Sequence, residues 1–580
     1  MTIVQMIWIA LLAGGLLFAQ ERADPRLGDG PLEQAFSLEP CDPEGRQGDL
    51  LCGSLPVPEN YEDPAGRSIS LNIAVAPALN SDSEVPPLFI LAGGPGLGAT
   101  GMSGYYLGPG QAYRERRDVV LVDQRGTGDS SPLQCPSLES LSPLEEMYPL
   151  PEVESCRREL ESKADLTQYT TLNSARDLDR VRSALGYAAI DLSGISYGTE
   201  LARAYMRLFP DRARRAILIG PPPNDMRTPL PHAANAQRAL DLLFHECQTD
   251  PECNAAFPNL REDWRSVLDK LAKGFRTGIL DPVTGKTNRI EVRKGPFAEA
   301  FRGLLATASG RRDVPRMIRS AAQGDFEPLL NAFPRDGSGF AEGLYLSIAC
   351  SEGTSRIEPE QIRRYTAETF LGDYRVNRQM AACGVWPRSA PPPEFYEPAA
   401  TDHPVLTFAG EFDATTPPTY AREICRSLEN CLLVEIPGMG HVPSDRPDWR
   451  GGACLVRLSL DFLEAEAGRH LDRSCVGRMA PPPFSTESTF PLAPEQLHEF
   501  LGTYESGVLR FNIDLLNDRL RVKVFRNEDL LGASMLSPLS ESRFRFDHFP
   551  GLHATFESDR FGMKAILSDG ETLRRIEEPD

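Results

Sequence analysis

The segment that most constrains the fold of this chain runs from Ile190 to Ala202 and reads Ile-Asp-Leu-Ser-Gly-Ile-Ser-Tyr-Gly-Thr-Glu-Leu-Ala. A short apolar run ends there in Gly-x-Ser-x-Gly, and a helical pattern of apolar residues follows at once. This order predicts a strand, a sharp turn and a helix, in which Gly194 and Gly198 avoid collisions that larger side chains would make. Such a turn leaves the Ser196 hydroxyl protruding as a candidate nucleophile, with an ordinary strand-to-helix turn as the alternative.

Further apolar runs on either side of this segment have the length and composition of strands buried on both faces. These runs are 88–91, 118–122, 216–219, 404–409 and 432–436. Because helical patterns lie between them, we expect a mostly parallel sheet, covered by helices on both faces. Two earlier runs, at 52–58 and 68–75, alternate with period two and predict antiparallel strands.

The chain has 580 residues, too many for one hydrophobic core. From 223 to 400 the alternation of strands and helices is lost and the pattern is helical, which is typical of a lid inserted over an active site; a separate helical domain is the alternative. Residues 479–494 are rich in Pro, Ser and Thr and predict a linker. Period-two alternation then predicts a small antiparallel β domain at 495–580, a barrel or a sandwich. The sheet domain itself is expected at 41–222 and 401–478.

The first twenty residues carry no charge and are almost entirely apolar from Ile3 to Ala19. We interpret 1–20 as a secretory signal peptide, so a secreted or periplasmic protein is expected. No Lys or Arg precedes the apolar run, which leaves an uncleaved N-terminal membrane anchor as the alternative. The net charge of −21 argues against nucleic acid and anionic membrane surfaces as partners.

Twelve cysteines in an exported chain favour disulfides. No CxxC or HxxxH pair accompanies them, so we expect no metal site. The sequence does not fix the pairing. Closeness along the chain suggests Cys41–Cys52, Cys247–Cys253 and Cys425–Cys431, and the pairs expected for the remaining cysteines, without a motif that selects them, are Cys135–Cys156, Cys350–Cys383 and Cys454–Cys475.

A serine hydroxyl needs a base to take its proton and a third group to orient that base. Two loops that follow predicted strands supply candidates, Asp413 in Gly-Glu-Phe-Asp and His441 in Gly-Met-Gly-His. Parallel strands place their carboxyl ends at one edge of the sheet, so we expect Ser196, His441 and Asp413 to meet there. In these roles Ser196 attacks, His441 is the general base and then the general acid, and Asp413 orients the imidazole.

The tetrahedral intermediate of such a reaction carries an oxyanion that needs two backbone N–H donors. Tyr197, directly after the nucleophile, offers one donor. Gly94, in the glycine loop after the 88–91 strand, offers the other. That loop lacks the Lys-Ser/Thr ending of a phosphate-binding loop, and we expect no cofactor.

Glycine-rich motifs follow the predicted strands: Gly93-Gly94-Pro95-Gly96, Asp123-Gln-Arg-Gly-Thr-Gly, Gly194-Ile-Ser-Tyr-Gly, Gly410-Glu-Phe-Asp and Gly438-Met-Gly-His. This set resembles the prolyl aminopeptidase and tripeptidyl aminopeptidase (TAP-like) branch of the α/β-hydrolases. The resemblance covers about 41–478. Ala92 stands where prolyl aminopeptidases often carry His, which favours the tripeptidyl type, and the C-terminal β domain is not a standard part of the family.

The resemblance implies a serine exopeptidase that removes residues from a free N-terminus, often with proline near the cut. Its substrates are peptides, whose ammonium group such enzymes hold with carboxylates. Glu342 and Glu352 in the lid, and Glu200 beside the serine turn, are the candidates, although a carboxylate near a helix N-terminus is also favourable by itself. An esterase or amidase with the same three residues is the alternative function, and a non-catalytic binding protein is a third.

Overall fold

The structure is a computed structural model that describes residues 36–41, 49–80, 85–333, 339–398, 401–442, 453–465, 471–479, 483–487, 489–506, 509–526, 528–559, 562–568 and 572–577. The predicted signal peptide at 1–20, and with it the question of an N-terminal anchor, lies outside these residues. None of the helices in the described ranges combines the length and the hydrophobicity that a membrane span requires.

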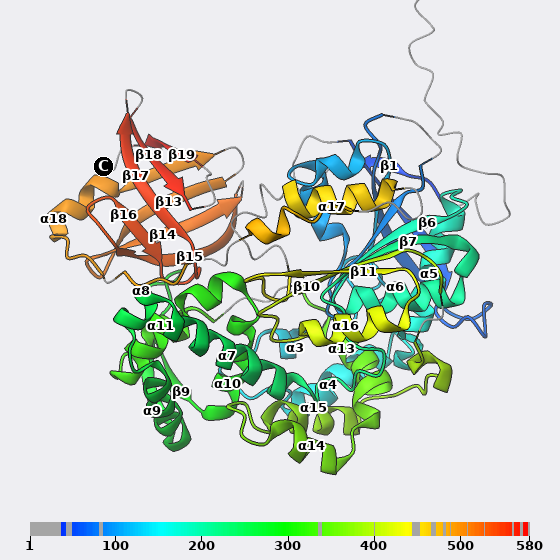
Figure 1. Cartoon of the computed structure of the whole chain (residues 1–580), viewed down its shortest axis with the longest axis horizontal. Helices are drawn as coiled ribbons and strands as arrows, with labels where there is room; N and C mark the ends of the chain where they lie inside the picture. Colours follow the sequence, from blue (N-terminus) through cyan, green and yellow to red (C-terminus); the bar gives the residue numbers. More distant parts are fainter. Residues whose placement is uncertain are drawn as a thin grey trace, which may run out of the picture.

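A nine-stranded sheet forms the centre of the molecule (Figure 1). Its first strands pair antiparallel and all pairs from β5 to β11 are parallel, so the prediction of a mostly parallel sheet is confirmed. In spatial order the strands are β1 (Glu39–Cys41), β2 (Leu50–Pro58), β3 (Ser68–Ala76), β5 (Val119–Val122), β4 (Leu88–Leu91), β6 (Ile190–Ile195), β7 (Ala213–Ile219), β10 (Val405–Gly410) and β11 (Cys431–Ile436).

Helices cover both faces of the sheet, which explains why the central strands β4 and β5 are apolar throughout. Leu88 and Ile90 of β4 pack towards one face, while Phe89 and Leu91 pack towards the other. The first face is covered by α2 (Ser103–Leu107) and α17 (Ala453–Glu464). The second is covered by α5 (Thr171–Ala184), α6 (Tyr197–Leu208) and α16 (Pro418–Ser427). Figure 1 shows α17 on one side of the sheet and α6 and α16 on the other.

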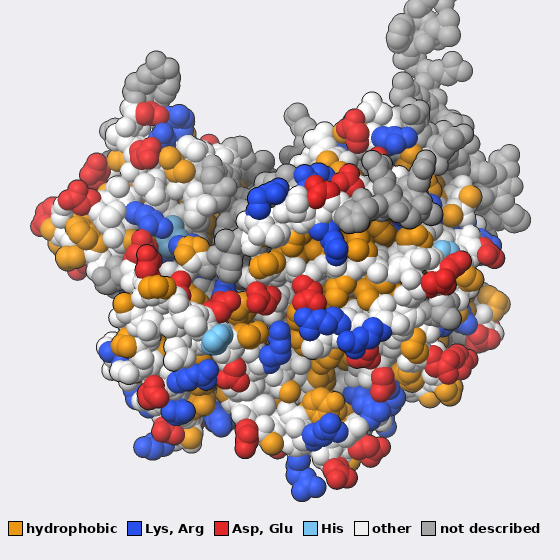
Figure 2. Space-filling model, in the orientation of Figure 1, with side chains coloured by type: hydrophobic (Ala, Val, Ile, Leu, Met, Phe, Trp, Pro, Cys, Tyr) orange, Lys and Arg blue, Asp and Glu red, His pale blue; other side chains and the backbone are white. Residues whose placement is uncertain are grey.

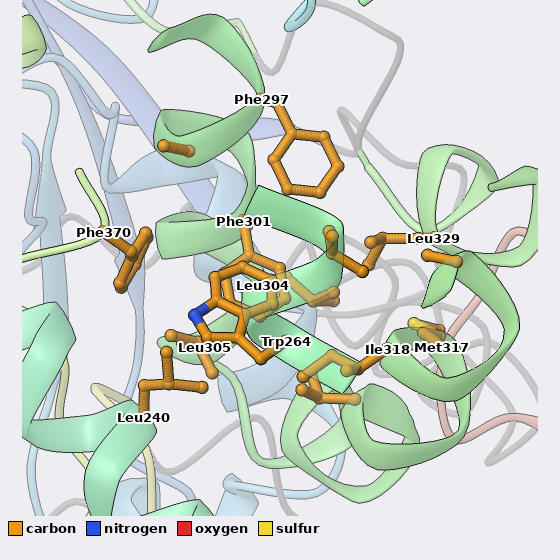
Figure 3. Close-up of a cluster of buried hydrophobic side chains, with 14 of the residues drawn as sticks. Leu240, Trp264, Phe297, Phe301, Leu304, Leu305, Met317, Ile318, Leu329 and Phe370 are labelled. Atoms are coloured by element: carbon orange, nitrogen blue, oxygen red, sulfur yellow. The ribbon is translucent and has the colours of Figure 1, made fainter. Parts of the chain in front are cut away.

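Between β7 and β10 the chain leaves the sheet and builds a layer of helices with a hydrophobic core of its own (Figure 3). In this core the Trp264 ring stacks on Phe301, with 4.5 Å between ring centroids. The helices are α7 (His232–Thr249), α8 (Pro251–Ala256), α9 (Leu260–Lys273), α10 (Lys294–Leu305), α11 (Ala308–Ala322), α12 (Glu327–Asn331), α13 (Glu342–Ile348), α14 (Pro359–Thr366) and α15 (Tyr374–Val385). Two further helices, α3 (Pro136–Glu139) and α4 (Leu150–Glu161), precede β6.

The lid also contains an antiparallel hairpin, β8 (Phe275–Leu280) and β9 (Thr287–Val292), which the helical prediction for this region missed. Only Ile279 and Val292 of the hairpin are fully buried. The alternation of apolar and polar residues that would have identified these strands in the sequence is therefore weak.

The C-terminal β domain is a closed barrel that follows the short helix α18 (Pro494–Leu497), in agreement with the prediction of a small antiparallel domain. Its strands are β12 (Gly502–Ser506), β13 (Leu509–Leu516), β14 (Arg519–Arg526), β15 (Asp529–Pro538), β16 (Arg543–Phe546), β17 (His553–Asp559), β18 (Gly562–Leu567) and β19 (Thr572–Glu577).

The barrel lies against the lid, beside α8 and α11 (Figure 1). The Gly551 N–H donates to Asp313 Oδ2 of α11 at 2.9 Å, and Arg519 of β14 lies 3.2 Å from Glu327 of α12. The barrel therefore braces the lid through polar contacts.

The six disulfides of the structure are the three pairs suggested by closeness along the chain and the three expected for the remaining cysteines. Acidic and basic side chains are interspersed over the face shown in Figure 2, so the excess of negative charge is not gathered into one patch there.

Removing the Phe301 side chain tests whether the lid core is close-packed. Phe301 is completely buried, so Phe301→Ala is expected to lower the free energy of unfolding by about 3–5 kcal/mol. Urea unfolding followed by tryptophan fluorescence measures the change, with Val283→Ala at an exposed lid position as the control. A loss below about 1 kcal/mol would contradict a tightly packed core.

Candidate active site

The turn between β6 and α6 holds Ser196 in a backbone conformation that few residues other than glycine adopt, with φ 54° and ψ −120°. The Ser196 N–H donates to the Ile219 carbonyl of β7 at 2.8 Å, which fixes the turn to the neighbouring strand. A Cβ on Gly198 would lie 2.1 Å from the Leu91 carbonyl oxygen, and one on Gly194 would lie 2.4 Å from the Gly198 carbonyl oxygen. Both glycines are therefore required for α6 to start this close to the ends of β4 and β6.

Three side chains from separate loops form a continuous hydrogen-bonded series at the carboxyl ends of β6, β10 and β11. His441 Nε2 lies 2.9 Å from Ser196 Oγ, and His441 Nδ1 lies 2.7 Å from Asp413 Oδ2. The structure thus brings together the three residues that the sequence singles out. This is the geometry in which an imidazole can accept the serine proton while a carboxylate fixes its tautomer.

Asp413 is completely buried and well supplied with donors. Its Oδ1 accepts hydrogen bonds from the backbone N–H groups of Thr415 and Thr416, both at 2.7 Å. Burial alone would raise the pKa of Asp413, but the neighbouring His441 and these N–H groups outweigh it and hold the pKa below its ordinary value. The carboxyl group therefore stays ionised beside the imidazole.

Thr416 is a member of this network that the sequence reasoning did not identify. Its Oγ1 lies 2.8 Å from Asp413 Oδ2, 3.1 Å from His441 Nδ1 and 2.8 Å from the Gly220 carbonyl oxygen. Only its place three residues after Asp413, in a loop that follows a strand, is visible in the sequence, and many threonines share such a place.

The two residues expected to stabilise an oxyanion both line the cavity beside Ser196. Tyr197 is the first residue of α6, where a backbone N–H has no acceptor within the helix. Gly94 has φ +115° and belongs to the loop after β4. That loop packs against the nucleophile, because a Cβ on Gly93 would lie 3.2 Å from the Ser196 Cβ.

A cavity of about 830 Å³ opens over Ser196 and His441, between the sheet and the lid. Its floor includes the glycine loop, and its roof includes Phe340, Tyr345 and Ile348. This volume is within the range of pockets that enclose small organic ligands or short peptides.

Two of the three candidate amine-binding carboxylates line this cavity, Glu200 and Glu352. Glu352 is 5% exposed; its Oε1 accepts from the Thr171 N–H at 2.7 Å and its Oε2 from the Thr171 hydroxyl at 2.6 Å. Burial, and then the neighbouring Glu200, raise the pKa of Glu352 to about 8. Burial also raises the pKa of Glu200, against the opposing effects of Arg203 and Arg356.

The third candidate, Glu342, is not among the residues that line the cavity. Its Oε2 accepts a hydrogen bond from the Tyr148 hydroxyl at 2.9 Å, and burial raises its pKa to about 7. The structure therefore brings Glu200 and Glu352 to the site and leaves Glu342 outside it.

Comparisons with known proteins agree with this geometry. Residues 86–248 match a family described as alpha/beta hydrolase fold, and residues 368–475 match a family described as TAP-like protein. A tripeptidyl aminopeptidase of Streptomyces lividans is 25% identical over 425 residues, which cover 66% of this chain and 76% of the relative. The serine protease Hip1 of Mycobacterium tuberculosis is 29% identical over 321 residues, which cover 49% of this chain and 60% of the relative.

Among solved structures, a proline iminopeptidase of Mycobacterium smegmatis is 17% identical, covers 71% of this chain and 98% of its own, and gives a TM-score of 0.35. A score this low adds nothing to the fold seen here.

Adding one methyl group at Gly198 tests the strained turn. Gly198→Ala is expected to lower the rate of fluorophosphonate labelling at Ser196 by at least about tenfold, because the new Cβ would force α6 away from β4 and misplace the hydroxyl. Gly384→Ala is the matched control, since a Cβ there meets no atom within 4 Å. Equal labelling rates for the two variants would contradict the close approach.

Proposed function

We propose that this chain, which belongs to the α/β-hydrolases and carries a TAP-like segment, is a secreted serine exopeptidase that removes amino acids or short peptides from free N-termini, including cuts next to proline. The observation that supports a serine hydrolase mechanism is the pair of hydrogen bonds that links Ser196 Oγ to His441 and His441 to Asp413 beneath the cavity. The names of the relatives support peptides as the substrate class.

The proposed reaction uses Ser196 Oγ to attack the scissile carbonyl carbon while His441 Nε2 takes the hydroxyl proton. Asp413 stabilises the imidazolium that forms, and the N–H groups of Tyr197 and Gly94 receive the oxyanion. When the intermediate collapses, the C–N bond breaks and His441 returns its proton to the leaving amine. Water, deprotonated by the same imidazole, then hydrolyses the acyl-enzyme and restores the Ser196 hydroxyl.

The proposed amine-binding pair is Glu200 and Glu352. Each oxygen of Glu352 accepts one hydrogen bond from Thr171, so each retains a lone pair for a substrate ammonium. Glu200 lies close enough to raise the pKa of the buried Glu352, so the two carboxyl groups resist holding two negative charges. A substrate cation between them relieves that repulsion, which gives a physical reason for a preference for free N-termini.

Secretion is proposed on the apolar N-terminal segment and on the six disulfides, since such bonds persist in oxidising compartments.

Aminoacyl- and tripeptidyl-4-nitroanilides with free and blocked amines test the reaction and the substrate class together. The free-amine substrates are expected to be hydrolysed at least about tenfold faster, because the blocked ones lose the charge that the carboxylates bind. Ser196→Ala is expected to lose fluorophosphonate labelling and at least about 1,000-fold in kcat. Equal rates on blocked and free substrates would favour the esterase or amidase alternative, and full activity in Ser196→Ala would show a different nucleophile.

Substitution of Glu352 tests the amine site. Glu352→Gln is expected to lower kcat/KM on free-amine substrates by roughly 10- to 100-fold, because a hydrogen bond to a charged group contributes about 1.5–3 kcal/mol. Glu342→Gln, outside the cavity, is expected to have the smaller effect, and the reverse order would contradict the assignment.

The pH dependence of kcat/KM gives a second test of Glu352. Because the carboxyl group of Glu352 binds ammonium only when ionised and its pKa is raised to about 8, kcat/KM is expected to fall as the pH drops below 8. In Glu352→Gln the part of this fall in kcat/KM that is due to Glu352 should be absent. Any fall that is due to protonation of the catalytic imidazole should remain.

A further inference from the structure

The active-site cavity has a second charged region that the proposed mechanism does not use. It is formed by Arg302 of α10, Arg375 of α15 and His232 at the start of α7, all of which line the cavity. We call these three residues the cationic end. Arg302 donates to Glu299 Oε1 at 2.7 Å, and Arg375 also pairs with Glu299. Two guanidinium groups thus share one carboxylate, and a positive charge is left in excess.

One further acidic group lies within electrostatic range of Arg375, namely Glu342. It offsets this excess only in part, because burial raises its pKa to about 7 and because its carboxylate bonds to Tyr148 outside the cavity.

Two buried polar atoms of the cationic end have no hydrogen-bond partner among the described residues, Arg375 Nε and His232 Nδ1. The two residues are only 8% and 5% exposed. Burial, together with the positive fields of Arg375 and Arg302, holds the pKa of His232 well below its ordinary value, so its ring is neutral. A carboxylate is the group whose geometry best matches a guanidinium.

The cationic end lies on the same side of the site as the general acid. The His441 N–H donates to the Ala306 carbonyl at 2.8 Å, and Ala306 lies one turn beyond Arg302 at the end of α10. His232 and His441 line the same cavity, and His441 also contributes to lowering the pKa of His232. Because His441 gives its proton to the leaving amine, the cationic end borders the leaving-group half of the cavity.

The two carboxylates lie towards the other half. Glu200 belongs to the first turn of α6, directly after Ser196, and Glu352 is linked to Tyr197 through the Thr171 hydroxyl, which lies 2.9 Å from Tyr197 Oη. One continuous helical segment joins the two ends of the cavity. Arg375 donates to the Tyr345 hydroxyl of α13 at 3.1 Å, and Glu352 follows about two turns later in the π-helix Ala349–Gly353.

At 1.5 Å per residue this segment rises about 10 Å from Tyr345, whose hydroxyl Arg375 contacts, to Glu352, and this rise is the length of roughly three extended residues. We propose that the cationic end binds a carboxylate of the leaving group, so that the preferred substrates are short peptides with a free terminus at each end. This inference rests on the proposed exopeptidase function, because it places the leaving group opposite the amine-binding carboxylates.

Matched peptides distinguish the sources of that carboxylate. Free-amine tri- and tetrapeptides are compared as C-terminal acids, as C-terminal amides, and as amides with Glu or Gln after the scissile bond. The acids are expected to be cleaved about tenfold faster than the amides, since a charge-assisted bidentate bond is lost in the amide. Decapeptide acids and amides should be cleaved at equal rates, because their C-terminus lies beyond the cationic end. A gain for Glu over Gln without a gain for the C-terminal acids would overturn the preference for a free C-terminus and assign the site to a side-chain carboxylate.

Equal rates for short acids and amides, together with equal rates for the Glu and Gln peptides, would overturn the proposal. That outcome differs from failure of the exopeptidase function, which is read from blocked and free amines on the same peptides.

Variants of Arg302 test whether the preference for C-terminal acids over amides arises at the cationic end. Arg302→Gln is expected to bring the acid-to-amide ratio close to one, and Arg302→Lys to keep most of it. Arg265→Gln, an exposed lid arginine on α9, is the matched control and should retain both the ratio and the activity of the parent. Thermal unfolding of each variant separates loss of the lid from loss of recognition. An unchanged ratio in folded Arg302→Gln would overturn the assignment; if that variant does not fold, Arg302→Lys and the parent ratio decide it.

Discussion

The approach of α6 to the end of β4 is the constraint on which the site depends. The backbone at Gly198 lies so close to the Leu91 carbonyl oxygen that no Cβ fits between them. That contact sets the height of Ser196 above the sheet. It also brings the glycine loop after β4 against Ser196. Because the loops that carry Asp413 and His441 leave neighbouring parallel strands at the same edge, fixing one of the three side chains nearly fixes the distances among all of them.

Neighbouring charges and hydrogen bonds decide how readily each carboxyl group of the site ionises. Asp413 keeps its charge because His441 and the surrounding N–H donors outweigh the effect of its burial, whereas burial raises the pKa of Glu352 and of Glu200. Three carboxyl groups of one site thereby differ in how readily they ionise. The stable charge of Asp413 suits a permanent partner of an imidazole. The raised pKa of Glu352 and Glu200 suits groups that bind a cationic ligand reversibly.

The sequence predicted the features that depend on local pattern or chain order. The continuous apolar run at 88–91 predicted a strand buried on both faces, and Gly-x-Ser-x-Gly predicted the turn at Ser196. The order of the candidate residues along parallel strands predicted that they would meet.

Features that depend on tertiary packing were not predictable. Thr416 has no motif of its own, and the β8–β9 hairpin buries too few side chains to leave an alternation. Glu200 lies beside Ser196 because it belongs to the serine turn. Which of the two lid glutamates, Glu342 or Glu352, lines the cavity depends on how the lid folds, and neither the periodicity nor the spacing of the sequence predicts it. The barrel's contacts with α11 and α12 likewise join segments far apart in the chain.

The hydrogen bond from the His441 N–H to the Ala306 carbonyl joins the loop of the catalytic imidazole to the lid. A lid that swung wide to admit a folded protein surface would pull on that loop and disturb the spacing to Ser196. In the proposed exopeptidase the substrate enters as a single chain terminus, which can reach Ser196 with less displacement of the lid than the two strands of an internal loop would need.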